Sequence, residues 1–381
     1  MKMGNKDHQL PFAGLAAIAV GYGFARYGYG LFVPTFREEF DLATGMVGFI
    51  ASGSYLGYFI ALMLVGVLAV RTGPRLLVVI GVLSAAIGMS LMAAASHPFL
   101  FALGVFIAGS STGWSWPPFS DAVARRIPPP KQSRALSIVS SGTAFGLVII
   151  GPIALLSGEE WRTVWLIFAA VAFIVAAWNA WAVPGLSKQK TGHVPSLRWS
   201  WFVCPKSRPL FFVAFSYGVT SSVYWTYAVD LTRSGNMPAD TGPVFWTLVG
   251  IGGFAGLAAG DCSKRFGLKY TLAAILAAYS LSIGTLAITL SWATIIVSGA
   301  LYGATFMMLA ALLVIWSADV FQDRPSVGVS AVILSLTTGS MLGPAVFGPL
   351  ADTFHLRVIF IIMAGLALLT VFVRPKGLKN S

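Results

Sequence analysis

The sequence predicts an all-α membrane protein whose twelve transmembrane helices form two pseudo-symmetric six-helix bundles. Three observations predict this architecture: the composition, the number of long apolar runs, and an internal repeat. Of the 381 residues, 57% are hydrophobic and 10% are charged. A soluble domain carries about 25% charged residues because its surface faces water. The composition therefore excludes a soluble enzyme or a disordered chain, and two cysteines exclude a disulfide scaffold.

A helix crosses the hydrocarbon core of a bilayer in about 20 apolar residues. Runs of this kind are bounded by charged residues or by Pro and Gly. They lie near 12–35, 44–70, 75–95, 98–120, 135–157, 161–183, 208–231, 243–262, 268–290, 292–317, 327–350 and 356–374. The first run is too long for the hydrophobic region of a signal peptide, and no A-x-A-like cleavage site follows it. We therefore expect it to remain as a transmembrane helix.

The distribution of Lys and Arg predicts the orientation of these helices, since cytoplasmic loops carry an excess of positive charge. With the N-terminus inside, twenty basic residues fall in cytoplasmic segments and four in outer loops, which leaves Arg26 inside the first span. We therefore expect a multi-pass protein of the bacterial inner (plasma) membrane with both termini in the cytoplasm. The net charge of +12 is then a topological signal. It implies contact with anionic lipid and no nucleic-acid partner.

The two halves of the chain repeat each other at a nearly constant offset. Tyr22-Gly23 recurs 195 residues later as Tyr217-Gly218, and Gly151-Pro152 recurs 197 residues later as Gly348-Pro349. The longest polar stretch separates the halves, which predicts an N-terminal bundle (1–183), a cytoplasmic linker (184–207) and a C-terminal bundle (208–381). Such duplication is typical of secondary transporters, whose substrate site lies near the membrane midplane at the interface between repeats.

The short loop after the second span carries a recognisable motif, Gly66-x-x-x-Val70-Arg71-x-Gly73-x-Arg75, and a weaker version follows the eighth span. With the twelve spans and the repeat, this loop resembles the signature loop of the major facilitator superfamily. The resemblance extends to a poorly characterised bacterial branch, through residues 21–36 and 51–58. It implies a secondary transporter that works by alternating access.

Two departures from the family pattern bear on mechanism. The signature loop usually has an acidic residue where this chain has Val70, and Lys264 occupies the equivalent place in the second half. Val105 replaces an arginine that proton-coupled drug exporters of the family carry in the fourth span. These departures argue against a simple drug/proton antiporter.

Two apparent enzyme motifs do not fit their required context. Residues 109–113 match G-x-S-x-G and residues 250–255 match G-x-G-x-x-A, but neither follows a predicted strand. We interpret both as glycine stripes for helix packing. His8, His97, His193 and His355 fall in loops or tails, so the sequence predicts no metal site, no cofactor and no enzymatic activity.

Arg26 is the strongest candidate for a substrate-binding residue. Burying an arginine in the membrane costs at least about 2.5–3.5 kcal/mol, so such a residue is expected to face the protein interior or a watery cavity. On an α-helix Tyr22, Arg26 and Tyr29 would share one face. Their repeat partners are Tyr217, Ser221 and Tyr224. The alternative is a structural arginine that bonds backbone carbonyls.

Other spans supply weaker candidates. Aromatic residues at similar depth are further candidates for substrate contact, namely Tyr55, Tyr58, Trp114, Tyr302 and Phe306. The basic signature loops and two acids at helix ends form a predicted inner gate, which consists of Arg71, Arg75, Asp121, Arg265 and Asp319. Alternatively, the two acids are simply solvated side chains at the ends of their helices. Asp230 is the one acid near a span that is a candidate for ion coupling. The alternatives are that the substrate carries the proton or that the protein is a uniporter or exchanger.

The sequence thus predicts a monomeric transporter of a small, anionic organic solute, with a proton as a possible second partner. One alternative keeps the fold and assigns proton-coupled efflux of hydrophobic drugs or metabolites. Another is a membrane enzyme or sensor, which lacks a soluble domain or a catalytic loop outside the spans.

Overall fold

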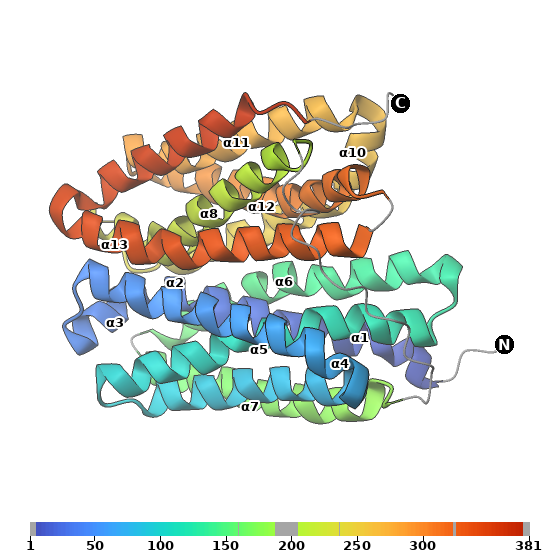
Figure 1. The fold of residues 1–381 in the computed structure, drawn as a ribbon. Coiled ribbons are helices and arrows are strands. Elements are labelled where there is room, and N and C mark those ends of the chain that lie inside the picture. The colour runs from blue at the N-terminus through green and yellow to red at the C-terminus, as the bar shows by residue number, and fades with distance from the viewer. Residues whose placement is uncertain (1–4, 159, 187–204, 236, 323–324, 376–381) are drawn as a thin grey trace. The chain divides into compact units, whose positions relative to one another are not determined.

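The computed structural model describes residues 5–158, 160–186, 205–235, 237–322 and 325–375, and these residues form helices and short connections without a strand (Figure 1). The helices are α1 (Asn5–Ile18), η1 (Ala19–Tyr27), α2 (Gly28–Leu31), α3 (Val33–Phe40), α4 (Thr44–Ala94), α5 (Pro98–Arg126), α6 (Pro129–Ser157), α7 (Trp161–Ala182), α8 (Arg208–Ser234), α9 (Thr241–Gly253), η3 (Phe254–Ala258), α10 (Ala259–Phe266), α11 (Leu268–Ile288), α12 (Trp292–Val320) and α13 (Pro325–Val371). Most of the predicted linker lies outside the described residues.

The predicted all-α fold of twelve spans is confirmed, although nine helices of the described residues are long and apolar enough to count as spans on their own. α4 holds the second and third spans, and α13 holds the eleventh and twelfth. The first span is divided among α1, η1 and α2. α8 forms the seventh span, which is less apolar because serine and threonine occupy much of its buried surface.

The connections between spans have local causes. The backbone of Gly73 has φ 74° within α4, and that of Gly267 has φ 78° at the end of α10, a conformation that favours glycine. The ninth and tenth spans, which are α11 and α12, are separated by residues 289–291 and divided by a capping box. The Ser291 hydroxyl accepts the backbone N–H of Thr294 at 3.3 Å, and the Thr294 hydroxyl accepts that of Ser291 at 2.9 Å.

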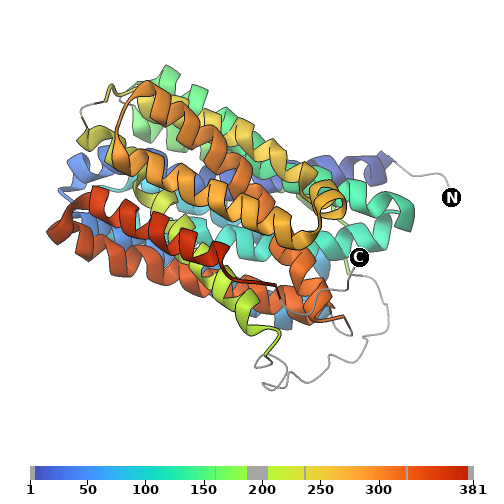
Figure 2. The same ribbon diagram turned by 90° about the horizontal axis from the view of Figure 1, so that it is seen from above.

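The chain forms two compact units. Unit 1 contains residues 1–42, 53–191 and 242–250, and unit 2 contains residues 43–52, 192–241 and 251–381. In unit 1, α1 and η1 pack against α5, α6 and α7. In unit 2, α8, α11, α12 and α13 pack against one another, as both ribbon views show (Figures 1 and 2). Each unit also includes one short segment from the other half of the sequence.

Candidate functional site

Arg26 lies on η1, a π-helical segment in the middle of the first span. The backbone N–H of Gly28 donates to the carbonyl of Gly23, five residues earlier, which is the π-helical spacing. The Arg26 side chain is 8% exposed. π-Helical turns are often found at functional sites. This π-helical segment could not be predicted from the sequence, because the hydropathy pattern does not distinguish a π-helix from an α-helix.

Four tyrosine rings surround the Arg26 guanidinium. The distance from Arg26 Cζ to the ring centroid is 4.3 Å for Tyr58, 4.6 Å for Tyr55, 5.6 Å for Tyr22 and 5.9 Å for Tyr27. Each ring lies within the range of a cation–π interaction, which is worth about 2 kcal/mol or more when the groups are desolvated. We call these four tyrosines and Arg26 the arginine cage. All of its members belong to unit 1.

The hydrogen bonds of Arg26 are incomplete. Nη1 donates to the Thr112 hydroxyl on α5 at 3.2 Å. Nε is buried without an acceptor, and no aspartate or glutamate among the described residues forms an ion pair with Arg26. A buried charge is ordinarily paired or fully hydrogen-bonded. The cage therefore holds a cation whose donors are not all used.

Glycines bring the helices of the cage close together. A Cβ at Gly109 of α5 would lie 2.6 Å from the backbone oxygen of Ser54 on α4, and one at Gly113 would lie 2.7 Å from that of Tyr58. These backbone contacts confirm that residues 109–113 form a packing stripe. They hold Tyr55 and Tyr58 of α4 beside Thr112 of α5, so that both helices reach Arg26.

The structure separates Tyr29 from the position that α-helical spacing predicts. A π-helix has more residues per turn, so Tyr29 does not share the face on which Tyr22 lies beside Arg26. The Tyr29 ring packs 5.7 Å from that of Phe36 and 6.3 Å from that of Phe101.

Tyr27 and Thr112 contact Arg26, although neither was predicted from the sequence. Trp114 is half-buried on α5. A Cβ added at Gly81 would lie 2.9 Å from the Cβ of Trp114.

The candidates from the second half form an aromatic cluster within unit 2. Its members are Tyr217, Tyr224, Trp225, Tyr279, Tyr302 and Phe306, all buried. The rings of Tyr224 and Tyr302 stack at 3.6 Å, and the Tyr217 hydroxyl donates to the Phe306 carbonyl at 2.8 Å.

The hydroxyls of this cluster have partners inside it or beside it. Tyr224 is hydrogen-bonded to Ser298 at 2.7 Å, and Tyr302 donates to the backbone oxygen of Ser221 at 3.3 Å. The Ser221 hydroxyl itself donates to the Gly218 carbonyl. The tyrosine hydroxyls of the cluster are thus all hydrogen-bonded, in contrast to the Arg26 guanidinium of the arginine cage.

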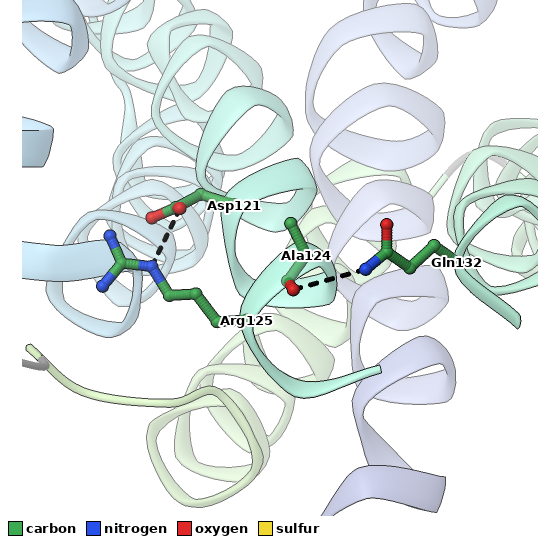
Figure 3. Close-up of polar contacts among 4 residues, drawn as sticks. All are labelled: Asp121, Ala124, Arg125 and Gln132. Carbon is green, nitrogen blue, oxygen red and sulfur yellow. Dashed lines mark hydrogen bonds and ion pairs between the residues drawn. The ribbon is translucent and has the colours of Figure 1, made fainter. Parts of the chain in front are cut away.

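The predicted gate residues of unit 1 contact residues of the same unit. Asp121 accepts a 2.8 Å hydrogen bond from Arg125 Nε one turn along α5, which Figure 3 shows beside the bond from Gln132 to the Ala124 carbonyl. Arg75 Nε donates to the Val183 carbonyl at 2.7 Å. Arg71 is exposed.

The remaining polar candidates lie on unit 2. Arg265 lies over the Phe266 ring, and the backbone oxygen of Asp319 accepts a bond from Gln322. The proposed coupling residue, Asp230, is 5% exposed on α8.

Comparisons with known proteins agree with this architecture. A profile described as the Major Facilitator Superfamily matches residues 15–289. The chain is 29% identical over 169 residues to the gentisate transporter of Corynebacterium glutamicum, covering 42% of this chain and 38% of that protein. It is 28% identical over 309 residues to the transcription regulatory protein OpdE of Pseudomonas aeruginosa, covering 76% of each. The nucleoside transporter NupG has a similar fold, with a TM-score of 0.76 at 14% identity over 97% of this chain and 98% of NupG.

Proposed function

The chain belongs to the Major Facilitator Superfamily, and on this premise we propose that it is a secondary transporter that moves a small organic anion across the bacterial inner membrane by alternating access. The proposal includes the predicted bundles 1–183 and 208–381, and both termini in the cytoplasm. The substrate would be held by Arg26.

The observation that carries the proposal is the incomplete bonding of Arg26. The residue is 8% exposed, its Nε has no acceptor, and its cation–π partners are neutral rings. A carboxylate would supply the missing acceptor and neutralise the charge. Hydrogen bonds to charged groups contribute about 1.5–3 kcal/mol, which corresponds to about 10- to 150-fold in Kd.

The tyrosine rings favour an organic anion over a small inorganic one, because they add apolar surface beside the charge. Gentisate is an aromatic carboxylate and is named as the substrate of one relative. It is therefore the first probe for this chain.

The test is uptake of labelled gentisate by purified protein in proteoliposomes. We expect Arg26→Ala to abolish uptake, and Arg26→Lys to weaken it because a lysine cannot form the planar two-point contact of a guanidinium. Arg162→Ala is the matched control. It removes the arginine that forms a surface ion pair with Glu39 at 2.8 Å, and this variant should transport gentisate at the wild-type rate.

Wild-type uptake that Arg26→Ala leaves unchanged would refute the role of Arg26. If gentisate is not carried, a thermal-shift screen of other carboxylates follows. A ligand at 100 times its Kd stabilises the folded protein by about 2.7 kcal/mol. Broad drug resistance on overexpression, with no anion flux, would favour efflux of hydrophobic compounds.

A second candidate function follows from the similarity to OpdE, whose name describes a regulator of transcription. In that case the bundle would bind a ligand and report it, without net transport. A ligand-dependent change in transcription that persists in a variant without flux would favour this candidate.

A further inference from the structure

Ser111 of α5 carries a buried hydroxyl that the fold leaves unbonded. The residue is 0% exposed, and its Oγ has no hydrogen-bond partner among the described residues. Serine and threonine inside a helix can donate to a carbonyl of the preceding turn. Two other serines of α5 do so, since Ser110 donates to the Ile107 carbonyl at 2.7 Å and Ser115 donates to the Ser111 carbonyl at 2.9 Å. The Ser111 hydroxyl therefore keeps its capacity to bond a ligand.

The direction of the Ser111 side chain follows from the glycines that flank it. Ser111 is the central residue of the G-x-S-x-G pattern at 109–113, whose glycines Gly109 and Gly113 pack against the backbone of α4. Two residues along an α-helix correspond to a rotation of about 200°. Ser111 therefore lies on the opposite side of α5 from α4, which is the side that faces η1. A Cβ at Gly21 of η1 would lie 3.4 Å from Ser111 Oγ.

The same side of α5 contacts Arg26. A Cβ at Gly21 would also lie 3.3 Å from Thr112 Cγ2, and the Thr112 hydroxyl accepts Arg26 Nη1 at 3.2 Å. Gly21 precedes Arg26 by five residues, which is about one turn of the π-helix. Ser111 thus lies about one helical turn from Arg26, and both residues belong to unit 1.

Two buried groups beside each other are therefore available to one ligand. Within the described part of the chain Arg26 Nε lacks an acceptor and Ser111 Oγ lacks a partner. The Thr112 hydroxyl is already used, because it accepts from Arg26 and donates to the Gly109 carbonyl at 3.4 Å. A carboxylate suits the guanidinium. A serine hydroxyl both donates and accepts, so a ligand hydroxyl can bond it in either direction, whereas a ligand carbonyl can only accept.

We propose that Ser111 is a specificity-determining residue that bonds a hydroxyl of the substrate, so that the preferred cargo is a hydroxylated carboxylate. The carboxylate would bind Arg26, and the tyrosine rings of the arginine cage would contact the carbon skeleton between the two polar groups. This inference rests on the proposed transport of an organic anion held by Arg26.

The test compares benzoate with meta-hydroxybenzoate and para-hydroxybenzoate, each of which adds one hydroxyl to the same carboxylate. Kd is measured by isothermal titration calorimetry on the full-length protein in detergent. We expect the wild-type protein to bind at least one hydroxybenzoate about 2- to 12-fold more tightly than benzoate, which is the gain typical of one hydrogen bond. Ser111→Ala should reduce this ratio of Kd values to about one, because alanine cannot bond the added hydroxyl.

The matched control is Ser110→Ala, which removes the adjacent hydroxyl, bonded within its own helix, and should keep the wild-type ratio. A folded Ser111→Ala protein with the wild-type ratio would overturn the assignment, as would equal binding of all three acids by the wild-type protein. Arg26→Ala is measured with benzoate in parallel. A benzoate Kd that Arg26→Ala leaves unchanged would contradict the proposed role of Arg26, whereas the ratio tests Ser111, so the two failures are distinguishable. Binding of none of the three acids by the wild-type protein would refute both.

Discussion

Adding one methyl group at Gly23 should destabilise the protein and displace Arg26, because the backbone of α6 occupies the space that the methyl group needs. A Cβ at Gly23 would lie 2.6 Å from Gly146 Cα and 2.9 Å from Gly146 C. Carbon atoms in favourable contact are about 3.5–4.0 Å apart. η1 and α6 would therefore have to separate by about 1 Å.

The atoms in the way are backbone atoms, which cannot rotate aside. Overpacking of this kind costs about 1–3 kcal/mol, and we expect Gly23→Ala to fall in the upper half of this range. Gly53→Ala is the matched control, since it adds the same methyl group to a helix where nothing lies within 4 Å. Any gain in helix propensity, about 1 kcal/mol for Gly to Ala, is common to both variants.

The assay is the free energy of unfolding in detergent, followed by tryptophan fluorescence, with gentisate uptake as a second readout. Gly23→Ala should be less stable than Gly53→Ala and should take up less gentisate, because Arg26 follows Gly23 by three residues on the same π-helix. Equal stability of the two variants would refute the close-packing argument.

Two further predictions concern buried polar groups. Asn179 Nδ2 donates to the carbonyls of Ala13 at 3.1 Å and Val175 at 2.9 Å, so Asn179→Asp, which places a carboxylate against two carbonyls, should cost about 3–5 kcal/mol. Asn179→Leu should cost less, and the reverse order of unfolding free energies would contradict this assignment. Tyr224→Phe keeps the ring stack and loses the hydrogen bond to Ser298, so it should lower the free energy of unfolding by about 1 kcal/mol. The affinity for gentisate should stay unchanged. A lower affinity would indicate that the Tyr224 hydroxyl binds the substrate.

The spans could be predicted from the sequence because long apolar runs and the positions of charged residues follow directly from the membrane environment. α8 has many hydroxyl side chains, but its apolar run, at 208–231, was still long enough to identify it as a span. The sequence placed a boundary between the ninth and tenth spans at residue 291, and the structure explains it by the Ser291–Thr294 capping box.

The arginine cage could be predicted only in part. Arg26 was found because one charge remained inside a span after the others had been assigned to loops. α-Helical spacing found Tyr22, but it missed Tyr27 and included Tyr29, because the π-helix changes which side chains share a face. Thr112 comes from another helix, and a single sequence does not report distances between helices.

Asp352 shows a different limit of sequence reasoning. Its carboxylate accepts the backbone N–H groups of Thr44 and Gly45, each at 2.9 Å. These contacts could not be predicted, because a single sequence does not report which residues of distant helices lie together.

The guanidinium of the arginine cage and the tyrosine hydroxyls of the aromatic cluster differ in how completely they are hydrogen-bonded, and this difference bears on where a substrate can gain binding energy. In unit 2 the Tyr224 hydroxyl must donate to Ser298, since the Ser298 proton goes to the Ser282 carbonyl at 2.6 Å. A ligand that bonded this tyrosine would first have to break an existing bond, which reduces its net gain. Arg26 Nε has no bond to break. An anion therefore gains more at the arginine cage than at the aromatic cluster, and substitutions at Arg26 should reduce substrate affinity more than substitutions of the cluster hydroxyls.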